Sequence, residues 1–232
     1  MRDTDKEIIE SLIARGDAGD AVAAYYAWWH PDARVHVHRE YDGVGLLLEG
    51  SSSLGPVSVL RASSVAEVPA LLKTMSPGRR YLMAPWELAD VIRETVRMEN
   101  VEHNAVFWHE PVEVRGKDEE AVITLVGSSQ PVTIHAEGNE VISAVGDTHV
   151  SRCWYLWESP EFAEIGVRTD PGFRRQGLGR AVVSAMIASL SRRGLKTLFV
   201  TSIENVASLR LAAGLGFRRH PGDESAGYVI PP

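Results

Sequence analysis

A short loop rich in glycine and arginine constrains the fold of this chain more than any other stretch. Residues 174–180 read Arg-Arg-Gln-Gly-Leu-Gly-Arg, and they follow a strand-like segment, residues 163–169, and a Pro171-Gly172 turn. They open into a helical pattern at residues 177–193. Glycines let the backbone approach a ligand closely, and the start of a helix offers unpaired N–H groups and partial positive charge. The arrangement therefore predicts a phosphate-binding site, to which the arginines add fixed charge.

The composition and charge of the 232 residues narrow the class of protein. Hydrophobic residues make up 44% and charged residues 24%, as in ordinary water-soluble domains. No apolar run reaches the roughly 18 residues of a membrane-spanning helix, and the polar start of the chain lacks the apolar core of a signal peptide. The net charge of −7 argues against general nucleic-acid binding. A single cysteine excludes an intramolecular disulfide bond, so we expect a reducing, cytoplasmic location.

The charge is divided unevenly along the chain. Residues 1–136 contain 13 basic and 21 acidic side chains, whereas residues 137–232 contain 11 and 10. An acidic first part suits a cationic substrate and a locally basic second part suits an anionic cofactor, although an acidic surface also serves solubility.

The order of predicted elements indicates a mixed α/β fold. Antiparallel strands precede the loop, and a strand–helix–strand–helix unit surrounds it. We expect two domains, an N-terminal α/β lobe over residues 1–130 and a second domain over residues 131–232. In the lobe, residues 86–99 predict a helix that starts after Pro85. Near the C-terminus, residues 217–219 and 227–230 predict two strands that pair around a turn at residues 221–223.

The loop and two later features together carry a family resemblance. The loop has the signature Gln/Arg-x-x-Gly-x-Gly/Ala at Arg174, Gly177 and Gly179. Downstream, Asn205 starts the next predicted helix, and Leu-Gly-Phe at residues 215–217 follows its end. With these features, residues from about 141 to 228 resemble the GNAT superfamily of acyl-CoA-dependent N-acyltransferases. The resemblance implies the GNAT fold for this region, with an extra N-terminal lobe that in some members is itself a degenerate GNAT-like fold.

The resemblance also implies acetyl-CoA as the acyl donor, without a metal. In this family, backbone N–H groups of the loop bind the pyrophosphate of coenzyme A, and the preceding strand and the helix asparagine hold its pantetheine arm. By position, the implied cofactor-binding residues are Val167, Arg168, Thr169, Arg174, Arg175, Gln176, Gly177, Leu178, Gly179, Arg180 and Asn205. The residues themselves argue against two other phosphate sites: the third glycine of a dinucleotide-binding loop would fall at Val182, and no Gly-Lys-Ser/Thr follows for a P-loop.

The implied chemistry is attack of an amine on a thioester, which needs a base for the amine and donors for the oxyanion. Glu164 lies on the strand where some family members place a general base. A glutamate paired with Arg152 or Arg168 is the structural alternative. A backbone N–H near Val167 is the simplest donor to the oxyanion.

One position departs from the family pattern. Many members protonate the leaving thiolate with a tyrosine seven residues after the asparagine, but Ala212 stands there in this chain. Ser208, Ser202 or water is left for that role, and a thiolate also leaves without help.

Several other side chains have both a functional and a structural interpretation. Cys153 lacks the neighbours of a catalytic cysteine, so we expect it to be buried. Two histidines, His36 and His38, share one face of a strand, but no third ligand is evident and no metal is expected. His109 and His149 are candidate acid–base groups. Trp154 and Trp157 either pack in the core or line a substrate pocket.

We therefore expect a cytoplasmic N-acetyltransferase that passes an acetyl group from acetyl-CoA to a primary amine by direct attack in a ternary complex. A small-molecule acceptor is favoured, and amino acids, polyamines, aminoglycoside-like compounds and protein N-termini all stay open. The alternative, motivated by Ala212, is a catalytically degenerate GNAT module that binds CoA as a sensor or scaffold. We expect no nucleic-acid or membrane partner, and a homodimer is open.

Overall fold

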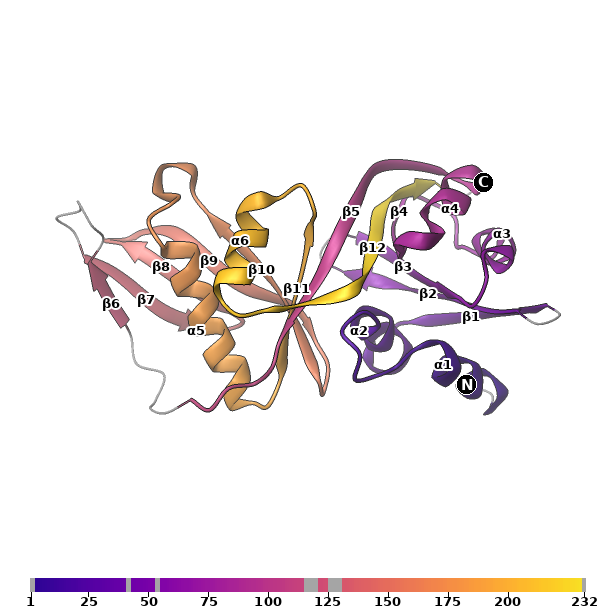
Figure 1. Ribbon diagram of the computed structural model, residues 1–232, viewed down its shortest axis with the longest axis horizontal. Coiled ribbons are helices and arrows are strands. Elements are labelled where there is room, and N and C mark those ends of the chain that lie inside the picture. The colour runs from indigo at the N-terminus through magenta and orange to yellow at the C-terminus, as the bar shows by residue number, and fades with distance from the viewer. Residues whose placement is uncertain (1–2, 41–42, 53–54, 115–120, 125–130, 231–232) are drawn as a thin grey trace. The chain divides into compact units, whose positions relative to one another are not determined.

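The computed structural model describes residues 3–40, 43–52, 55–114, 121–124 and 131–230 (Figure 1). The chain forms two compact units. Unit 1 comprises Met1–Val106, Ser202–Glu204 and His220–Pro232, and unit 2 comprises Phe107–Thr201 and Asn205–Arg219. Both units contain helices and strands, which confirms the predicted mixed α/β class. The predicted domain boundary after residue 130 borders residues 125–130, outside the described part of the chain, and stays a prediction.

Unit 1 is built on a mixed sheet whose strands follow the order β1-β2-β3-β4-β12-β5. Strands β1, β2 and β3 are consecutive antiparallel neighbours, β3 and β4 run parallel, and β4 and β12 run antiparallel. The bounds are β1 Arg34–Glu40, β2 Gly43–Ser52, β3 Gly55–Ala62, β4 Arg80–Pro85, β5 Arg97–His109 and β12 Arg218–Ile230. Both β5 and β12 contain residues of both units, so the chain passes between the units along strands.

Helices cover both faces of this sheet. Leu46, Leu47 and Leu48 in β2 are all 0% exposed. Because successive strand residues point to opposite faces, three buried leucines in a row require cover on each side. The helices are α1 Asp3–Leu12, α2 Ala21–Ala24, α3 Val68–Lys73 and α4 Ala89–Thr95, with a π-helical turn at Tyr25–Trp29. In Figure 1, α1 and α2 lie on one side of β2 and β3, and α3 and α4 lie on the other.

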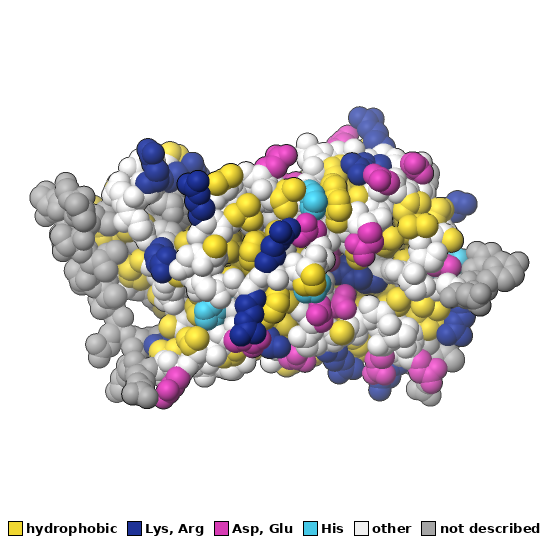
Figure 2. All heavy atoms as spheres, viewed as in Figure 1, with side chains coloured by type: hydrophobic (Ala, Val, Ile, Leu, Met, Phe, Trp, Pro, Cys, Tyr) yellow, Lys and Arg dark blue, Asp and Glu magenta, His cyan; other side chains and the backbone are white. Residues whose placement is uncertain are grey.

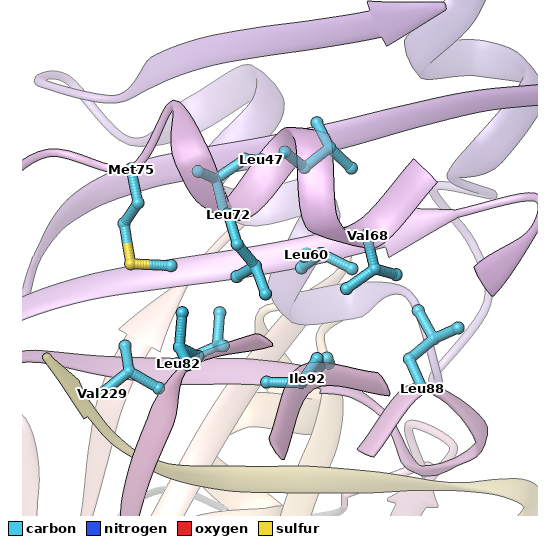
Figure 3. Close-up of a cluster of buried hydrophobic side chains, with 12 residues drawn as sticks. Leu47, Leu60, Val68, Leu72, Met75, Leu82, Leu88, Ile92 and Val229 are labelled. Atoms are coloured by element: carbon cyan, nitrogen blue, oxygen red, sulfur yellow. The ribbon is translucent and has the colours of Figure 1, made fainter. Parts of the chain in front are cut away.

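The core of unit 1 lies under α3 and α4 (Figure 3). It gathers side chains from strands and helices that are distant in sequence. Members that are at most 1% exposed include Leu47 from β2, Leu60 from β3, Leu72 from α3, Ile92 from α4 and Val229 from β12. The last strand of the chain therefore completes a core that the first hundred residues begin.

Unit 2 contains the sheet β11-β10-β9-β8-β7-β6. All neighbours run antiparallel except β10 and β11, which are parallel. The strands are β6 Ala121–Thr124, β7 Pro131–Glu137, β8 Glu140–Val145, β9 Thr148–Glu158, β10 Phe162–Thr169 and β11 Lys196–Ser202. Helix α5, Leu178–Arg192, packs on β8, β9 and β10 (Figure 1), and α6, Val206–Gly214, follows β11.

Two predicted elements are wrong. The helix expected at residues 86–99 is a 3₁₀ turn, Trp86–Leu88, followed by α4, which ends at Thr95. Val96 is buried in the core and has extended backbone, so α4 ends before it and the chain continues into β5. The hairpin expected around residues 221–223 is absent, because β12 continues through Pro221. Pairing of β12 with β4 begins only at Glu224, so the missing N–H of proline removes no bond from that ladder.

The surface of the described residues carries charges of both signs. On the face drawn in Figure 2, acidic and basic side chains lie among hydrophobic ones. Large exposed hydrophobic residues such as Val65 and Val206 are separate in sequence, and single residues of this kind are normal at protein surfaces. No helix in the described part of the chain is long and apolar enough to cross a membrane.

The unit 1 core predicts the effect of a cavity. Leu82→Ala should lower the free energy of unfolding by about 2–5 kcal/mol, because Leu82 is 1% exposed and its removal leaves a void. Urea unfolding followed by circular dichroism measures the change. The control is Val65→Ala at a position 54% exposed, which should stay within about 0.5 kcal/mol of the wild type. Equal losses for the two variants would contradict the described core.

Candidate functional site

The glycine- and arginine-rich loop joins β10 to α5 through left-handed backbone. Arg175 has φ of 60° and Gly177 has φ of 85°. Gly177 is the N-cap residue of α5, and the N–H of Ala181 donates to its carbonyl in the first helical bond. The N–H groups of residues 178–180 therefore have no partner one turn earlier in the helix and point out of its start. This is the geometry of an anion site.

Buried contacts and hydrogen bonds hold the loop in place. Leu178 is 1% exposed and packs with Val132 and Val150 of the sheet. Arg174 Nε donates to the carbonyl oxygen of Thr169 at 3.2 Å. A Cβ atom at Gly179 would lie 3.2 Å from Thr169 Oγ1, so the start of α5 and the end of β10 approach closely. The structure thus brings together Thr169, Arg174 and Gly179, three of the residues that the resemblance assigns to the cofactor.

The charges of the loop are positive and open to solvent. Arg174, Arg175 and Arg180 are all exposed, and no ion pair among the described residues involves them. The Arg180 side chain runs beside Gly214 of α6, since a Cβ at Gly214 would lie 2.9 Å from Arg180 Nη1. Three arginines and the positive end of a helix dipole therefore share one surface.

The sheet opens next to this loop. The parallel pairing of β10 and β11 covers only residues 162–164 and 196–198, although β10 continues to Thr169 and β11 to Ser202. A β-bulge in the pairing of β10 with β9 falls between Glu164 and Ile165, at the point where the pairing with β11 ends. Beyond it, residues 165–169 of β10, which include Val167 and Arg168, present an edge that β11 does not pair.

Gly166 lies at the start of this unpaired stretch. A Cβ there would stand 2.8 Å from the indole of Trp154, so only glycine admits this close contact. Trp154 thus packs against the strand beside the opening. Its indole also lies under the Arg152 guanidinium, 4.9 Å from the ring centroid.

Glu164 is buried at the point where the pairing of β10 with β11 ends. It is 9% exposed, and Trp157 Nε1 donates a 2.6 Å hydrogen bond to its Oε2. Arg152, one of the two expected partners, pairs with Glu140 at 3.6 Å instead. The sequence did not predict the hydrogen bond from Trp157. A β-bulge determines which residues of β9 and β10 lie opposite one another, and the sequence pattern gave no sign of that bulge.

Asn205 caps α6. Its Oδ1 accepts a hydrogen bond from the backbone N–H of Ser208 at 3.2 Å, so the capping role predicted from the sequence is confirmed. Ser208 is half-buried in the first turn. Ala212, where many family members have tyrosine, is 0% exposed. Its carbonyl accepts from the N–H of Phe217, which ends the helix.

The other candidate residues have structural partners. Cys153 is 0% exposed as predicted, and burial, with the nearby Glu140 charge, raises the pKa of its thiol far above the usual range. Such a thiol is a poor nucleophile. His36 Nε2 lies 3.0 Å from Glu49 Oε2, and His38 Nε2 lies 3.4 Å from Glu67 Oε2.

The remaining histidines contact aromatic rings of unit 2. His109 packs edge-on against Phe217, with ring centroids 5.4 Å apart, and His149 lies 6.4 Å from His135. Roles of His109 and His149 in acid–base chemistry stay predictions. Within the described ranges, no group of three His, Cys, Asp or Glu residues is arranged to hold a metal.

Solved structures with a similar fold include two that are described as GCN5-related N-acetyltransferases or acetyltransferase-like. A GCN5-related N-acetyltransferase from Kribbella flavida superposes with a TM-score of 0.58 at 17% identity, over 94% of this chain and 97% of that chain. A GCN5-related N-acetyltransferase-like protein from Streptococcus suis gives 0.54 at 13% identity, over 96% and 99%. The chain therefore has the GNAT fold, as predicted from the sequence.

Sequence comparisons find similar proteins for the C-terminal part of the chain. Residues 154–225 match the family model described as FR47-like protein. A 54-residue stretch is 40% identical to the ribosomal protein bS18 alanine N-acetyltransferase of Escherichia coli, and covers 23% of this chain and 36% of that protein. The match thus spans about a third of the relative's length. Together, these matches confirm the resemblance to the GNAT superfamily.

The cap of α6 gives a stability prediction. Asn205→Ala should lower the free energy of unfolding by about 1 kcal/mol, because the Ser208 N–H loses its acceptor. Asn205→Ser keeps a capping oxygen and is the matched control. Its loss of unfolding free energy should be no more than a few tenths of the loss in Asn205→Ala. Urea unfolding separates the two variants. A serine variant as unstable as the alanine variant would argue against the cap.

Proposed function

We propose that this protein is an acetyl-CoA-dependent N-acetyltransferase. The observation that carries the proposal is the start of α5, where left-handed Gly177 exposes helix N–H groups beside three solvent-exposed arginines. A pyrophosphate needs such donors and charge. The fold and the match to FR47-like protein support the same choice of ligand. A cytoplasmic location and a homodimer stay predictions.

The residues present fit coenzyme A. Backbone N–H groups of residues 175–180 would bind the pyrophosphate, with the arginine side chains around it. The unpaired edge of β10 at residues 167–169 would hold the pantetheine arm by main-chain hydrogen bonds, as added strands do in peptide recognition. The amide of Asn205 would donate to the same arm, because capping uses only its Oδ1. When bound, acetyl-CoA supplies an activated acetyl thioester.

Binding of acetyl-CoA tests this assignment directly. Isothermal titration should show binding at micromolar concentration, and Arg174→Glu combined with Gly177→Glu should abolish it, because two negative charges face the pyrophosphate. The matched control is Gly138→Glu combined with Arg218→Glu. Gly138 also has positive φ and is exposed, and an added Cβ there would meet no atom, so the charge change is the same and both glutamates replace glycines at positive φ.

The control should bind normally, and circular dichroism should show both double variants folded. If the wild type gave no heat of binding at high micromolar acetyl-CoA, the proposal would be wrong.

We infer that the acceptor is a primary amine and that Glu164 takes its proton during direct attack in a ternary complex. The carboxylate lies where the pairing of β10 and β11 ends, and Trp157 holds its Oε2. A backbone N–H near Val167, on the unpaired edge, would donate to the developing oxyanion. Ser208 is a candidate proton donor at the start of α6.

The acceptor is either a small molecule or a protein. The acidic first 136 residues favour a cationic small molecule. The curated relative is named for an alanine of a ribosomal protein, so a peptide with an N-terminal alanine belongs in the same panel of acceptors.

Glu164→Gln should lower kcat by about 100-fold or more, the usual contribution of a general base. The Kd for acetyl-CoA should stay unchanged, because the amide is isosteric and still accepts from Trp157. Thiol release from acetyl-CoA over amino acids, polyamines and an alanine-terminated peptide measures the rate. Glu158→Gln, at an exposed carboxylate paired with Arg193, is the control and should keep wild-type kcat. Unchanged kcat in Glu164→Gln would remove this residue from the mechanism.

A CoA-binding sensor or scaffold without catalysis is the second candidate. The enclosed Ala212, in place of the family's tyrosine, favours it. The same thiol-release assay decides between the two. Turnover well above background excludes the sensor, whereas tight binding without turnover on every acceptor supports it.

A further inference from the structure

An acidic cavity of about 160 Å³ lies wholly within unit 1. Five carboxylates line it: Asp17, Asp20, Glu87, Asp223 and Glu224. The cationic side chain in its lining is Arg61, and His220 is the histidine. These residues come from four separate parts of the sequence, so the fold assembles the cavity.

Four hydrogen bonds hold Arg61, and two carboxylates balance its charge. It is 4% exposed, and its Nε donates to Asp20 Oδ1 at 3.1 Å while its Nη2 donates to Glu224 Oε1 at 2.6 Å. The same Nη2 donates to the carbonyl of Gly19 at 2.8 Å, and Nη1 donates to that of Leu60 at 3.0 Å. One buried cation therefore faces two carboxylates.

Glu224 is the residue whose bonding is incomplete. It is 6% exposed, and its Oε2 is buried with no hydrogen-bond partner among the described residues. Burial raises the pKa of Glu224 to about 7, against the lowering effect of Arg61, and the charges of Asp20 and Glu87 raise it further. A buried carboxylate oxygen without a donor is costly, by about 1–3 kcal/mol, so the site favours a ligand that brings a donor.

The other carboxylates keep the cavity negative. Asp17 lies 3.1 Å from His220 Nε2, and Asp223 lies 2.8 Å from His103 Nε2. Glu87 is exposed in the turn before α4. The five acidic groups outnumber Arg61 and the two histidines together, and a cation entering the cavity is attracted by all of the acidic groups.

We propose that this cavity binds an alkylammonium group. An ammonium supplies the hydrogen-bond donor that Glu224 Oε2 lacks, and its charge offsets the surplus of carboxylates. The volume is that of about five water molecules, which suits the end of a short amine chain. A metal is a poorer occupant, because no metal-ligating cluster of three exists among the described residues and Arg61 already bridges two of the carboxylates. The proposal does not depend on acetyl transfer.

The experiment uses the full chain and butylammonium chloride as the probe, with 1-butanol as the neutral analogue of the same length. Isothermal titration at pH 7 should give a Kd on the order of 1 mM for butylammonium and no binding of butanol. Glu224→Gln should weaken binding at least tenfold, since the amide carries no charge but keeps an acceptor for Arg61. Glu87→Gln, at an exposed residue of the lining, should weaken binding about threefold, because one of the attracting charges is removed.

A matched control and a proton measurement complete the test. Glu10→Gln removes an exposed carboxylate of unit 1 that pairs with Arg15, and it should bind as the wild type does. A cation beside Glu224 lowers the pKa of its carboxyl, so binding should release protons, detected as different heats in phosphate and MOPS buffers, neither of which contains a primary ammonium ion. That difference should vanish in Glu224→Gln.

Equal binding of butanol and butylammonium would overturn the proposal. So would unchanged affinity in both Glu224→Gln and Glu87→Gln, or displacement of butylammonium by equimolar MgCl₂. Circular dichroism of each variant must match the wild type for its affinity to count, and Glu87→Gln provides the test if Glu224→Gln does not fold.

Discussion

The left-handed turn at Gly177 is the constraint on which the C-terminal part of the molecule depends. It lets β10 end, the chain reverse and α5 begin within a few residues, so that the helix start faces outward beside the end of the strand. Leu178, the first residue of the helix, is already buried against Val132 of β7 and Val150 of β9. A side chain at position 177 would meet no atom, and its cost would be the backbone conformation alone.

The second constraint is the limited pairing of β10 with β11. Parallel strands normally continue their ladder, and here it ends after three residue pairs, where the bulge next to Glu164 bends β10. The glycine-rich turn and the strand edge that β11 does not pair are consecutive in the chain. One short stretch, residues 164–180, therefore offers a buried carboxylate, an open strand edge and positive charge in that order. A ligand with a reactive end, an amide-containing arm and a phosphate end matches this order.

The sequence predicted the parts of the structure that local chemistry determines. The glycine turn, the cap at Asn205 and the lengths of α5 and α6 depend on residues a few positions apart, and all were found close to their expected places. The sequence analysis missed the features that depend on how strands and helices pair and pack. The bond from Trp157 to Glu164 follows from a bulge, and the end of α4 follows from burial of Val96. The cavity around Arg61 joins residues near positions 20, 61, 87 and 224, which no local pattern connects.

The continuity of β12 has a consequence for how the protein is made. Val229, at 0% exposure, belongs to the same core as Leu47 and Leu60, and β4 finds its antiparallel partner only in residues 224–229. In the sequence, the residues of unit 2 lie between β4 and residues 224–229, so they are translated before β4 gains this partner. Unit 1 therefore keeps an open sheet edge and an incomplete core until translation has passed through unit 2. Its fold is completed after that of its neighbour in the chain, although most of its residues are translated first.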